Sequence, residues 1–151
     1  MIAVIQRVYS ASVIADGAPA GKINKGLYIL LGVTKGDSRD DAVALAEKIS
    51  KLRIFSDENG KMNLSVKDVG GEALIVSNFT LNANYAHGNR PDYLNSAAPD
   101  VANELYEFFV GQLKARDISC ATGVFGADMK TDMATDGPVT IVMDSNVLLR
   151  K

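Results

Sequence analysis

The chain has 151 residues, of which 47% are hydrophobic and 23% charged, and its formal net charge at pH 7 is −2. The length fits one domain (residues 1–151) with a sizeable core, and the slight negative charge argues against a broad nucleic-acid-coating surface while leaving room for a local basic face. A single cysteine excludes an internal disulfide and a Cys-rich metal site, and no apolar run is long enough to span a bilayer, so we expect a cytoplasmic protein with no metal, no cofactor and no membrane association.

The first third of the chain predicts strands. Residues 2–8 and 10–15 alternate between apolar and polar side chains, and Asp16-Gly17 after them is typical of a tight turn. Residues 27–33 form a short apolar run, which predicts a buried strand.

A helix is expected next. Ser38 followed by Asp41 matches a capping box, and apolar residues at helical spacing follow, so the pattern predicts an amphipathic helix over residues 39–53. Residues 61–65 predict a short edge strand.

The rest of the chain repeats this alternation. Residues 73–77 predict a buried strand, and a 3.6-residue apolar stripe predicts a second helix from Pro99 to about Arg116. Strand character then returns at residues 119–123, 128–133 and 139–143. This order indicates an α+β fold with two principal helices packed on a mainly antiparallel, barrel-like sheet.

The end of the strand at residues 73–77 is a candidate site. Ser77, Asn78, Phe79 and Thr80 follow directly after an apolar run. Backbone N–H groups at a strand end can lack ladder partners, and fixed unpaired amides are what a developing oxyanion needs. An ordinary strand end with two hydroxyls facing solvent fits the local sequence as well.

A second candidate is the turn signal at Asp136, Gly137 and Pro138, directly before a predicted strand. Other chemistry is sparse. His87 lies in a polar loop with nothing to place it beside Ser77, and Asp128 could act as a base but more often such a residue is structural.

Together these stretches resemble the paired signatures of the D-aminoacyl-tRNA deacylase family. The resemblance extends along nearly the whole chain and includes Ser77-Asn78-Phe79-Thr80-Leu81, Asp136-Gly137-Pro138-Val139-Thr140, Gln6-Arg7-Val8, Leu30-Leu31-Gly32-Val33, Lys61-Met62-Asn63-Leu64-Ser65, Arg90-Pro91 and Phe125-Gly126-Ala127-Asp128-Met129. Two positions depart from the family pattern, which has Gln in place of Asn78 and Asn in place of Thr135. The shorter Asn78 amide bears on rate and selectivity.

The resemblance implies a homodimer that hydrolyses the ester of D-aminoacyl-tRNA, and of glycine mischarged on the tRNA for alanine. It implies that Gly137 and Pro138, joined by a cis bond, enter the site from the partner subunit, exclude L side chains and are supported by Arg7. Aminoacylated tRNA is then the expected partner, bound at its 3′ end, with no DNA expected.

The same resemblance assigns catalysis to the strand end. Ser77 and Asn78 belong to it, and the amides of Phe79 and Thr80 would form the oxyanion site, with the ribose 2′-OH orienting a water. In a competing mechanism the Thr80 hydroxyl is the nucleophile, although it has no evident base. Phe125 and Met129 fit a pocket wall and plain core packing equally.

Two other functions stay open. One is a non-catalytic dimer that binds aminoacylated RNA ends, with hydrolysis weakened by Asn78. The other is an interaction protein that uses the same dimer. The sequence does not give the preferred amino acid or tRNA, or the surface that would hold the acceptor stem.

Overall fold

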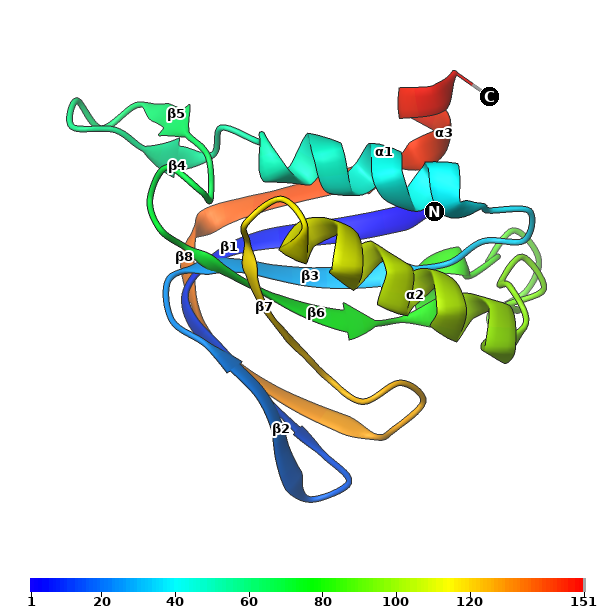
Figure 1. The fold of residues 1–151 in the computed structure, drawn as a ribbon. Helices are drawn as coiled ribbons and strands as arrows, with labels where there is room; N and C mark the ends of the chain where they lie inside the picture. Colours follow the sequence, from blue (N-terminus) through cyan, green and yellow to red (C-terminus); the bar gives the residue numbers. More distant parts are fainter. Residues whose placement is uncertain (151) are drawn as a thin grey trace.

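A single long strand, β1, organises the sheet of the computed structural model, which describes residues 1–150. It pairs antiparallel with three other strands, and the remaining two strands extend the sheet from β3 (Figure 1). The six strands of this sheet are β1 (Ile2–Ala15), β2 (Ala18–Ile23), β3 (Gly26–Gly32), β6 (Glu72–Ser77), β7 (Ser119–Thr122) and β8 (Met129–Asp144).

The sheet is mixed, because β3 pairs parallel with β6 and β6 pairs parallel with β7. Each parallel pair is joined by a long connection that contains a helix, and such a crossover returns the chain to the same end of the sheet. The prediction of an α+β fold with a mainly antiparallel, barrel-like sheet is confirmed, with these two parallel pairs as the addition.

The sheet curls until its two edges approach each other. A Cβ atom built on Gly21 of β2 would lie 2.5 Å from the carbonyl oxygen of Thr122 in β7. A residue with a side chain would push these edges apart, so Gly21 permits the nearly closed shape.

Two helices, α1 (Arg39–Ser50) and α2 (Pro99–Lys114), cover one face of the sheet (Figure 1). The predicted capping box is present at α1, where the backbone N–H of Ser38 donates to Asp41 Oδ2 at 2.9 Å. The helix ends three residues before the predicted boundary of 53. Its last turn tightens, with the Lys51 N–H donating to the Lys48 carbonyl at 3.3 Å, and this satisfies end carbonyls in place of a further helical turn.

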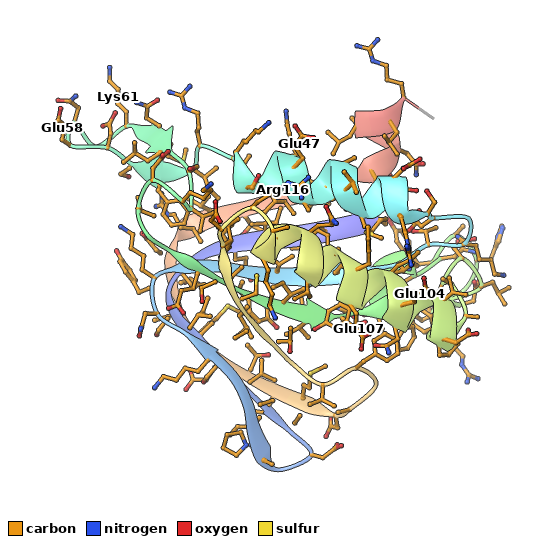
Figure 2. The ribbon with its side chains drawn as sticks, in the orientation of Figure 1. Glu47, Glu58, Lys61, Glu104, Glu107 and Arg116 are labelled. Atoms are coloured by element: carbon orange, nitrogen blue, oxygen red, sulfur yellow. The ribbon has the colours of Figure 1, made fainter. Side chains whose placement is uncertain are left out.

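The helices bury apolar side chains against the sheet and expose charged ones. Leu45, Ile49 and Phe109 are at most 1% exposed in the main core, whereas Glu47, Glu104 and Glu107 are exposed (Figure 2). A second buried cluster lies where the sheet curls, and it comprises Val8, Ala11, Val13, Ile23, Tyr28, Leu74 and Val76.

The predicted breaks in the first and last strands were wrong, because β1 and β8 each run continuously past them. They pair with each other over nearly their whole lengths, and the ladder absorbs irregular residues as bulges. Gln6 pairs with Thr140 and Val8 pairs with Thr135, so Arg7 alone lies opposite residues 136–139. The Asp-Gly-Pro turn signal is therefore a bulge within β8.

Elements without a strong sequence pattern were missed or only partly predicted. The edge strand at residues 61–65 is confirmed as β5 (Met62–Leu64), which pairs with the short β4 (Phe55–Ser56). The predicted tight turn is present as well, and Asp16 and Gly17 both have positive φ. No sequence pattern indicated β2 or the terminal helix α3 (Ser145–Leu149).

Tertiary contacts hold α3. The buried Ser145 hydroxyl donates to Asp41 Oδ1 at 2.7 Å, and the amine of Met1 donates to the same hydroxyl at 2.8 Å. The α3 segment is thus fixed by contacts with α1 and Met1 rather than by its own five residues. Within residues 1–150, no helix is long and apolar enough to cross a membrane.

Candidate active site at the end of β6

The chain leaves the sheet at Asn78. Its backbone N–H donates to the Leu31 carbonyl at 2.8 Å, and a short 3₁₀ helix, η1 (Phe79–Asn82), begins immediately afterwards. The extended backbone of Asn78 (φ −144°, ψ 96°) is typical of a residue that caps a helix, and its side chain does cap η1. The predicted strand end is present, but it turns into a helical turn before the loop.

Gly32 lets this turn lie close to β3. A Cβ atom at Gly32 would come within 3.0 Å of both the Asn78 carbonyl oxygen and the Leu81 Cβ. The absence of a side chain at the end of β3 therefore helps to fix where residues 78–81 lie.

The two predicted oxyanion amides, those of Phe79 and Thr80, differ in their hydrogen-bond partners. The Phe79 N–H has no hydrogen-bond partner among residues 1–150. The Thr80 N–H instead donates to Asn78 Oδ1 at 3.2 Å, and the Thr80 hydroxyl donates to the same oxygen at 2.5 Å. The Asn78 side chain thus hydrogen-bonds the backbone two residues on, as a short Asn side chain commonly does in turns. The Thr80 N–H has no ladder partner within residues 1–150, but the Asn78 side chain occupies it.

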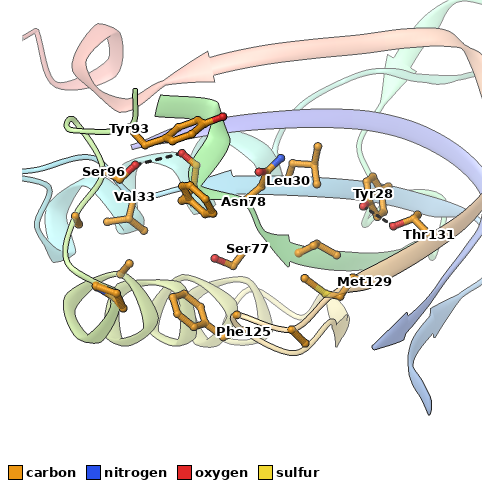
Figure 3. A pocket seen from close by; sticks show the side chains of 17 residues that line it. Tyr28, Leu30, Val33, Ser77, Asn78, Tyr93, Ser96, Phe125, Met129 and Thr131 are labelled. Atoms are coloured by element: carbon orange, nitrogen blue, oxygen red, sulfur yellow. Dashed lines mark hydrogen bonds between the residues drawn. The ribbon is translucent and has the colours of Figure 1, made fainter. Parts of the chain in front are cut away.

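A cavity of about 740 Å³ opens beside this strand end (Figure 3). Its size and largely apolar lining suit a small-molecule group with a few fixed polar contacts. The lining residues are Tyr28, Leu30, Val33, Val76, Ser77, Asn78, Phe79, Tyr93, Ser96, Ala97, Pro99, Ala102, Phe125, Gly126, Ala127, Met129 and Thr131.

Five of the residues singled out from the sequence meet in this cavity. Ser77, Asn78 and Phe79 come from the end of β6, and Phe125 and Met129 come from the β7–β8 connection and the start of β8. Phe125 also contacts Tyr106, with ring centroids 6.1 Å apart, and so joins the cavity wall to the core. Both interpretations of Phe125, pocket wall and core packing, describe part of its position.

Sequence reasoning missed several lining residues. Tyr93 packs edge-on against Phe79 with centroids 5.0 Å apart, and the Ser96 hydroxyl donates to the Phe79 carbonyl at 3.3 Å. Both lie in a loop, where no periodicity marks them. Tyr28, which hydrogen-bonds Thr131 at 3.0 Å, could have been identified from the sequence. In a strand, residues two apart lie on the same face, so Tyr28 shares a face with Leu30.

The structure does not bring the second motif into the same cavity. Gly137 and Pro138 are exposed, their peptide bond is cis, and neither residue lines the cavity of its own chain. Arg7 contacts this bulge directly. Its Nε donates to the Asp136 carbonyl at 3.0 Å, its second terminal nitrogen lies 3.1 Å from Asp136 Oδ1, and Nη1 donates to the Ile54 carbonyl at 2.6 Å.

Other reactive groups lie outside the cavity. His87 and Asp128 are exposed and do not line it. Among residues 1–150 no group of three or more His, Cys, Asp or Glu side chains could hold a metal ion.

Cys120 is expected to resist alkylation in the folded protein. Burial raises the pKa of its thiol from 9.0 to about 11, so at pH 8 the folded state holds about 100-fold less thiolate than the unfolded chain. Because the folded state disfavours the thiolate, this group lowers the free energy of unfolding as the pH rises from 9 toward 11. The same effect on the thiolate means that iodoacetamide should modify Cys120 at least about tenfold more slowly in buffer than in urea. Mass spectrometry after timed labelling checks this, and equal rates in buffer and urea would contradict it.

Gly123→Ala is expected to perturb substrate binding rather than stability. A Cβ at Gly123 would lie 2.5 Å from Met129 Sδ, the end of a flexible side chain that can move at small cost, toward the adjacent cavity. We expect the KM for a substrate bound in this cavity to rise several-fold, with little change in Tm. Gly111→Ala is the matched control, because a Cβ there meets nothing within 4 Å. A KM equal to that of the control would contradict the role of Met129 in the cavity wall.

Comparisons with known proteins agree along nearly the whole chain. The model of the family described as D-Tyr-tRNA(Tyr) deacylase matches residues 4–144. Proteins named D-aminoacyl-tRNA deacylase from Thermosipho africanus (strain TCF52B) and Koribacter versatilis (strain Ellin345) are 54% and 52% identical to it over 145 residues, which is 96% of this chain and 97% of each relative.

Solved structures share the fold. The structure titled "c-Myc DNA Unwinding Element Binding Protein" matches with a TM-score of 0.88 and 37% identity, covering 95% of this chain and 98% of that one. A structure titled as a probable eukaryotic D-amino acid tRNA deacylase matches with a TM-score of 0.81 at 12% identity, covering 94% and 97%, and shows likeness of fold alone.

The fold, the cavity and these matches define an enzyme of the hydrolase class. The chain belongs to the D-Tyr-tRNA(Tyr) deacylase family. The resemblance drawn from the sequence is thereby confirmed.

Proposed function

We propose that this protein hydrolyses the ester that joins a D-amino acid to the terminal ribose of tRNA, and that it does so in the cytoplasm. The observation that carries the proposal is the Phe79 amide, which has no partner among residues 1–150, in a residue that lines a largely apolar cavity of a chain whose relatives are named for this activity. An aminoacyl ester is already activated, so positioning, an oxyanion site and a water suffice for its hydrolysis.

The working enzyme in this proposal is a homodimer. Gly137 and Pro138 are exposed on their own chain and take no part in its cavity, so a second copy is needed to bring them to the strand end of the first. Within residues 1–150 the edge strand β8 pairs with β1 alone, and its Val142 side chain is 68% exposed. This open edge supports an assembly along this side.

The reaction then follows from the groups at the strand end. Water attacks the ester carbonyl carbon, and the carbonyl electron pair moves to the oxygen, where the Phe79 amide stabilises the negative charge. The Thr80 amide can join it only when Asn78 releases it. The intermediate collapses, the bond to the ribose oxygen breaks, and the proton lost by the water is delivered to that oxygen. The neighbouring 2′-OH, which both donates and accepts hydrogen bonds, can orient the water.

Chiral selection in this proposal works by exclusion. The carbonyl groups of Gly137 and Pro138 from the partner subunit would bind the substrate amino group and leave no space for an L side chain. Glycine has no side chain to exclude, so glycine mischarged on the tRNA for alanine would also be hydrolysed. Arg7 would hold the Asp136–Pro138 bulge in position through its contacts with Asp136.

The test compares hydrolysis of matched D-Tyr-tRNA, L-Tyr-tRNA and Gly-tRNA by the purified protein, with and without a chelator. Rapid loss of the D and glycyl esters, with the L ester spared, is the expected result. The oligomeric state is measured in parallel by light scattering, and a monomer that is fully active would contradict the shared site.

The alternative is a non-catalytic dimer that binds aminoacylated RNA ends. It is favoured by one observation, the occupied Thr80 amide. No hydrolysis of any ester by a folded dimer that still binds aminoacyl-tRNA would support it. Competition by DNA tests the remaining expectation that DNA is not a partner, which matters because a structural relative is titled as a DNA-binding protein.

A further inference from the structure

The loop between η1 and α2, residues 83–98, has a base fixed by one Asn–Asp pair. The Asn84 N–H donates to the Asp92 carbonyl at 2.8 Å, and the Asp92 N–H donates to the Asn84 carbonyl at 3.0 Å. Their side chains are joined too, because Asn84 Nδ2 donates to Asp92 Oδ2 at 2.9 Å, while Asp92 Oδ1 accepts the Leu94 N–H at 3.1 Å. Tyr85 and Tyr93 directly follow the two paired residues, so their backbones lie at this fixed base.

The 83–98 loop also forms part of the cavity wall. Its Tyr93 packs against Phe79, and its Ser96 hydroxyl donates to the Phe79 carbonyl (Figure 3). The connection from β3 to α1 lies alongside the loop, since the Lys35 N–H donates to the Asn95 carbonyl at 2.8 Å (Figure 1). The loop and this connection therefore lie next to each other on the side of the cavity that holds Phe79.

The exposed side chains on this side combine apolar groups with cations. Tyr85 is 81% exposed and Leu94 is 72% exposed, and an exposed aromatic ring is a platform on which a nucleic-acid base can stack. Arg90 and Lys35 are exposed, and neither makes an ion pair within residues 1–150, so both can bind phosphate. The loop's only carboxylate, that of Asp92, is hydrogen-bonded within the loop.

The other side of the cavity differs in charge. The β7–β8 connection, residues 123–128, contains one charged residue, the exposed Asp128. Its carboxylate repels a phosphate, whereas Arg90 and Lys35 attract one. A polyanion that leaves the cavity is therefore favoured to cross the 83–98 loop rather than the β7–β8 connection.

We propose that the 83–98 loop binds the unpaired nucleotides that precede the terminal adenosine of the tRNA substrate. Tyr85 stacks on a base, and Arg90 and Lys35 bind phosphates. The proposal rests on the proposed hydrolase function and adds to it the path of the RNA outside the cavity. In that function the ester lies at Phe79, so the nucleotides attached to it leave past the neighbouring loop. Unpaired bases at an RNA end are open to stacking by aromatic side chains.

The first test compares D-Tyr-tRNA with the D-tyrosyl ester of adenosine, which keeps the ester and the terminal nucleoside but lacks the preceding nucleotides. Tyr85→Ala should lower kcat/KM for D-Tyr-tRNA by about tenfold, through KM, and leave kcat/KM for the adenosine ester within about twofold. Tyr85→Phe keeps the ring and should restore the activity on D-Tyr-tRNA. An equal loss on both substrates would show that the loop acts by shaping the cavity, and would overturn the proposal.

The second test uses salt to count phosphate contacts. Arg90→Gln and Lys35→Gln should each raise the KM for D-Tyr-tRNA and reduce the slope of log KM against log salt concentration by about 0.7, the value for one phosphate on a single strand. Lys61→Gln is the matched control, because Lys61 is exposed at the opposite end of the molecule, between β4 and β5 (Figure 2). Slopes that equal the control's for both variants would contradict the phosphate contacts.

Binding of uncharged tRNA for tyrosine, followed by fluorescence anisotropy, separates this proposal from the proposed hydrolysis. Tyr85→Ala and Arg90→Gln should each raise the Kd about fivefold or more, and removing the unpaired 3′ nucleotides from the tRNA should abolish these differences. If the unchanged protein hydrolyses neither ester, the proposed function fails, and the Kd values still decide the role of the loop. Equal Kd values for the unchanged protein and both variants would overturn that role.

Discussion

Arg7→Ala is expected to destabilise the protein by about 2–4 kcal/mol and to abolish most deacylation. The Arg7 side chain is 10% exposed, and it holds the carboxylate and the carbonyl of Asp136, which itself is 20% exposed. Its removal leaves these oxygens and the Ile54 carbonyl without their charged donor. The substitution therefore removes the contacts that hold the bulge with Gly137 and Pro138, which lies opposite Arg7 in the β1–β8 ladder.

Urea denaturation gives the change in stability, and hydrolysis of D-Tyr-tRNA below the unfolding transition gives the change in activity. Arg53→Ala is the matched control, because Arg53 makes an exposed contact with the Asn63 carbonyl and should cost well under about 1 kcal/mol. Arg7→Lys keeps the charge but cannot place donors on Asp136 and Ile54 together, so we expect it to restore only part of the activity. A folded Arg7→Ala protein with unchanged hydrolysis would show that the bulge has no part in the site.

A tRNA that ends in 2′-deoxyadenosine is expected to be hydrolysed about 100-fold more slowly than its ribose counterpart. The Thr80 hydroxyl donates to the Asn78 carboxamide oxygen, which is not a base, and the other candidates, His87 and Asp128, lie outside the cavity. Among the described residues, no carboxylate, imidazole or amine side chain lines the cavity, so in the proposed mechanism the ribose 2′-OH orients the water.

The measurement is single-turnover hydrolysis of the two substrates at saturating enzyme, which separates chemistry from binding. In the same assay Thr80→Ala should retain most activity, because it keeps the backbone N–H that contacts Asn78. Equal rates on both substrates, together with a loss of several orders of magnitude in folded Thr80→Ala, would instead support the Thr80 hydroxyl as nucleophile.

The predictions were accurate for features that depend only on residues close together in the sequence. The capping box, the helical apolar stripes and the Asp16-Gly17 turn depend on residues within four positions of one another, and all three are present. The predicted breaks in β1 and β8 were wrong, because a bulge and a turn use the same residue types, and only the partner strand determines which of them forms.

The same distinction between local and long-range information applies to the residues of the candidate site. Residues 77–80 stood out because polar side chains follow a buried apolar strand, whereas Tyr93 and Ser96 gave no signal in a loop. The hydrogen bond from Thr80 to Asn78 was not anticipated either. It depends on the backbone angles at the strand end, which β3 and Gly32 help to fix.

By itself the sequence determined the α+β class, the two principal helices, the family and the residues of the strand end. These follow from side-chain period, capping chemistry and contiguous motifs, all of which are local in the chain. Only the tertiary structure decided that Phe125 and Met129 face Ser77 across one cavity, that Arg7 braces the Asp136 bulge, and that the Asn78 carboxamide is oriented by Thr80. These contacts depend on strand register and on the curvature of the sheet, which arise from pairing between residues as far apart in the chain as Ile2 and Asp144.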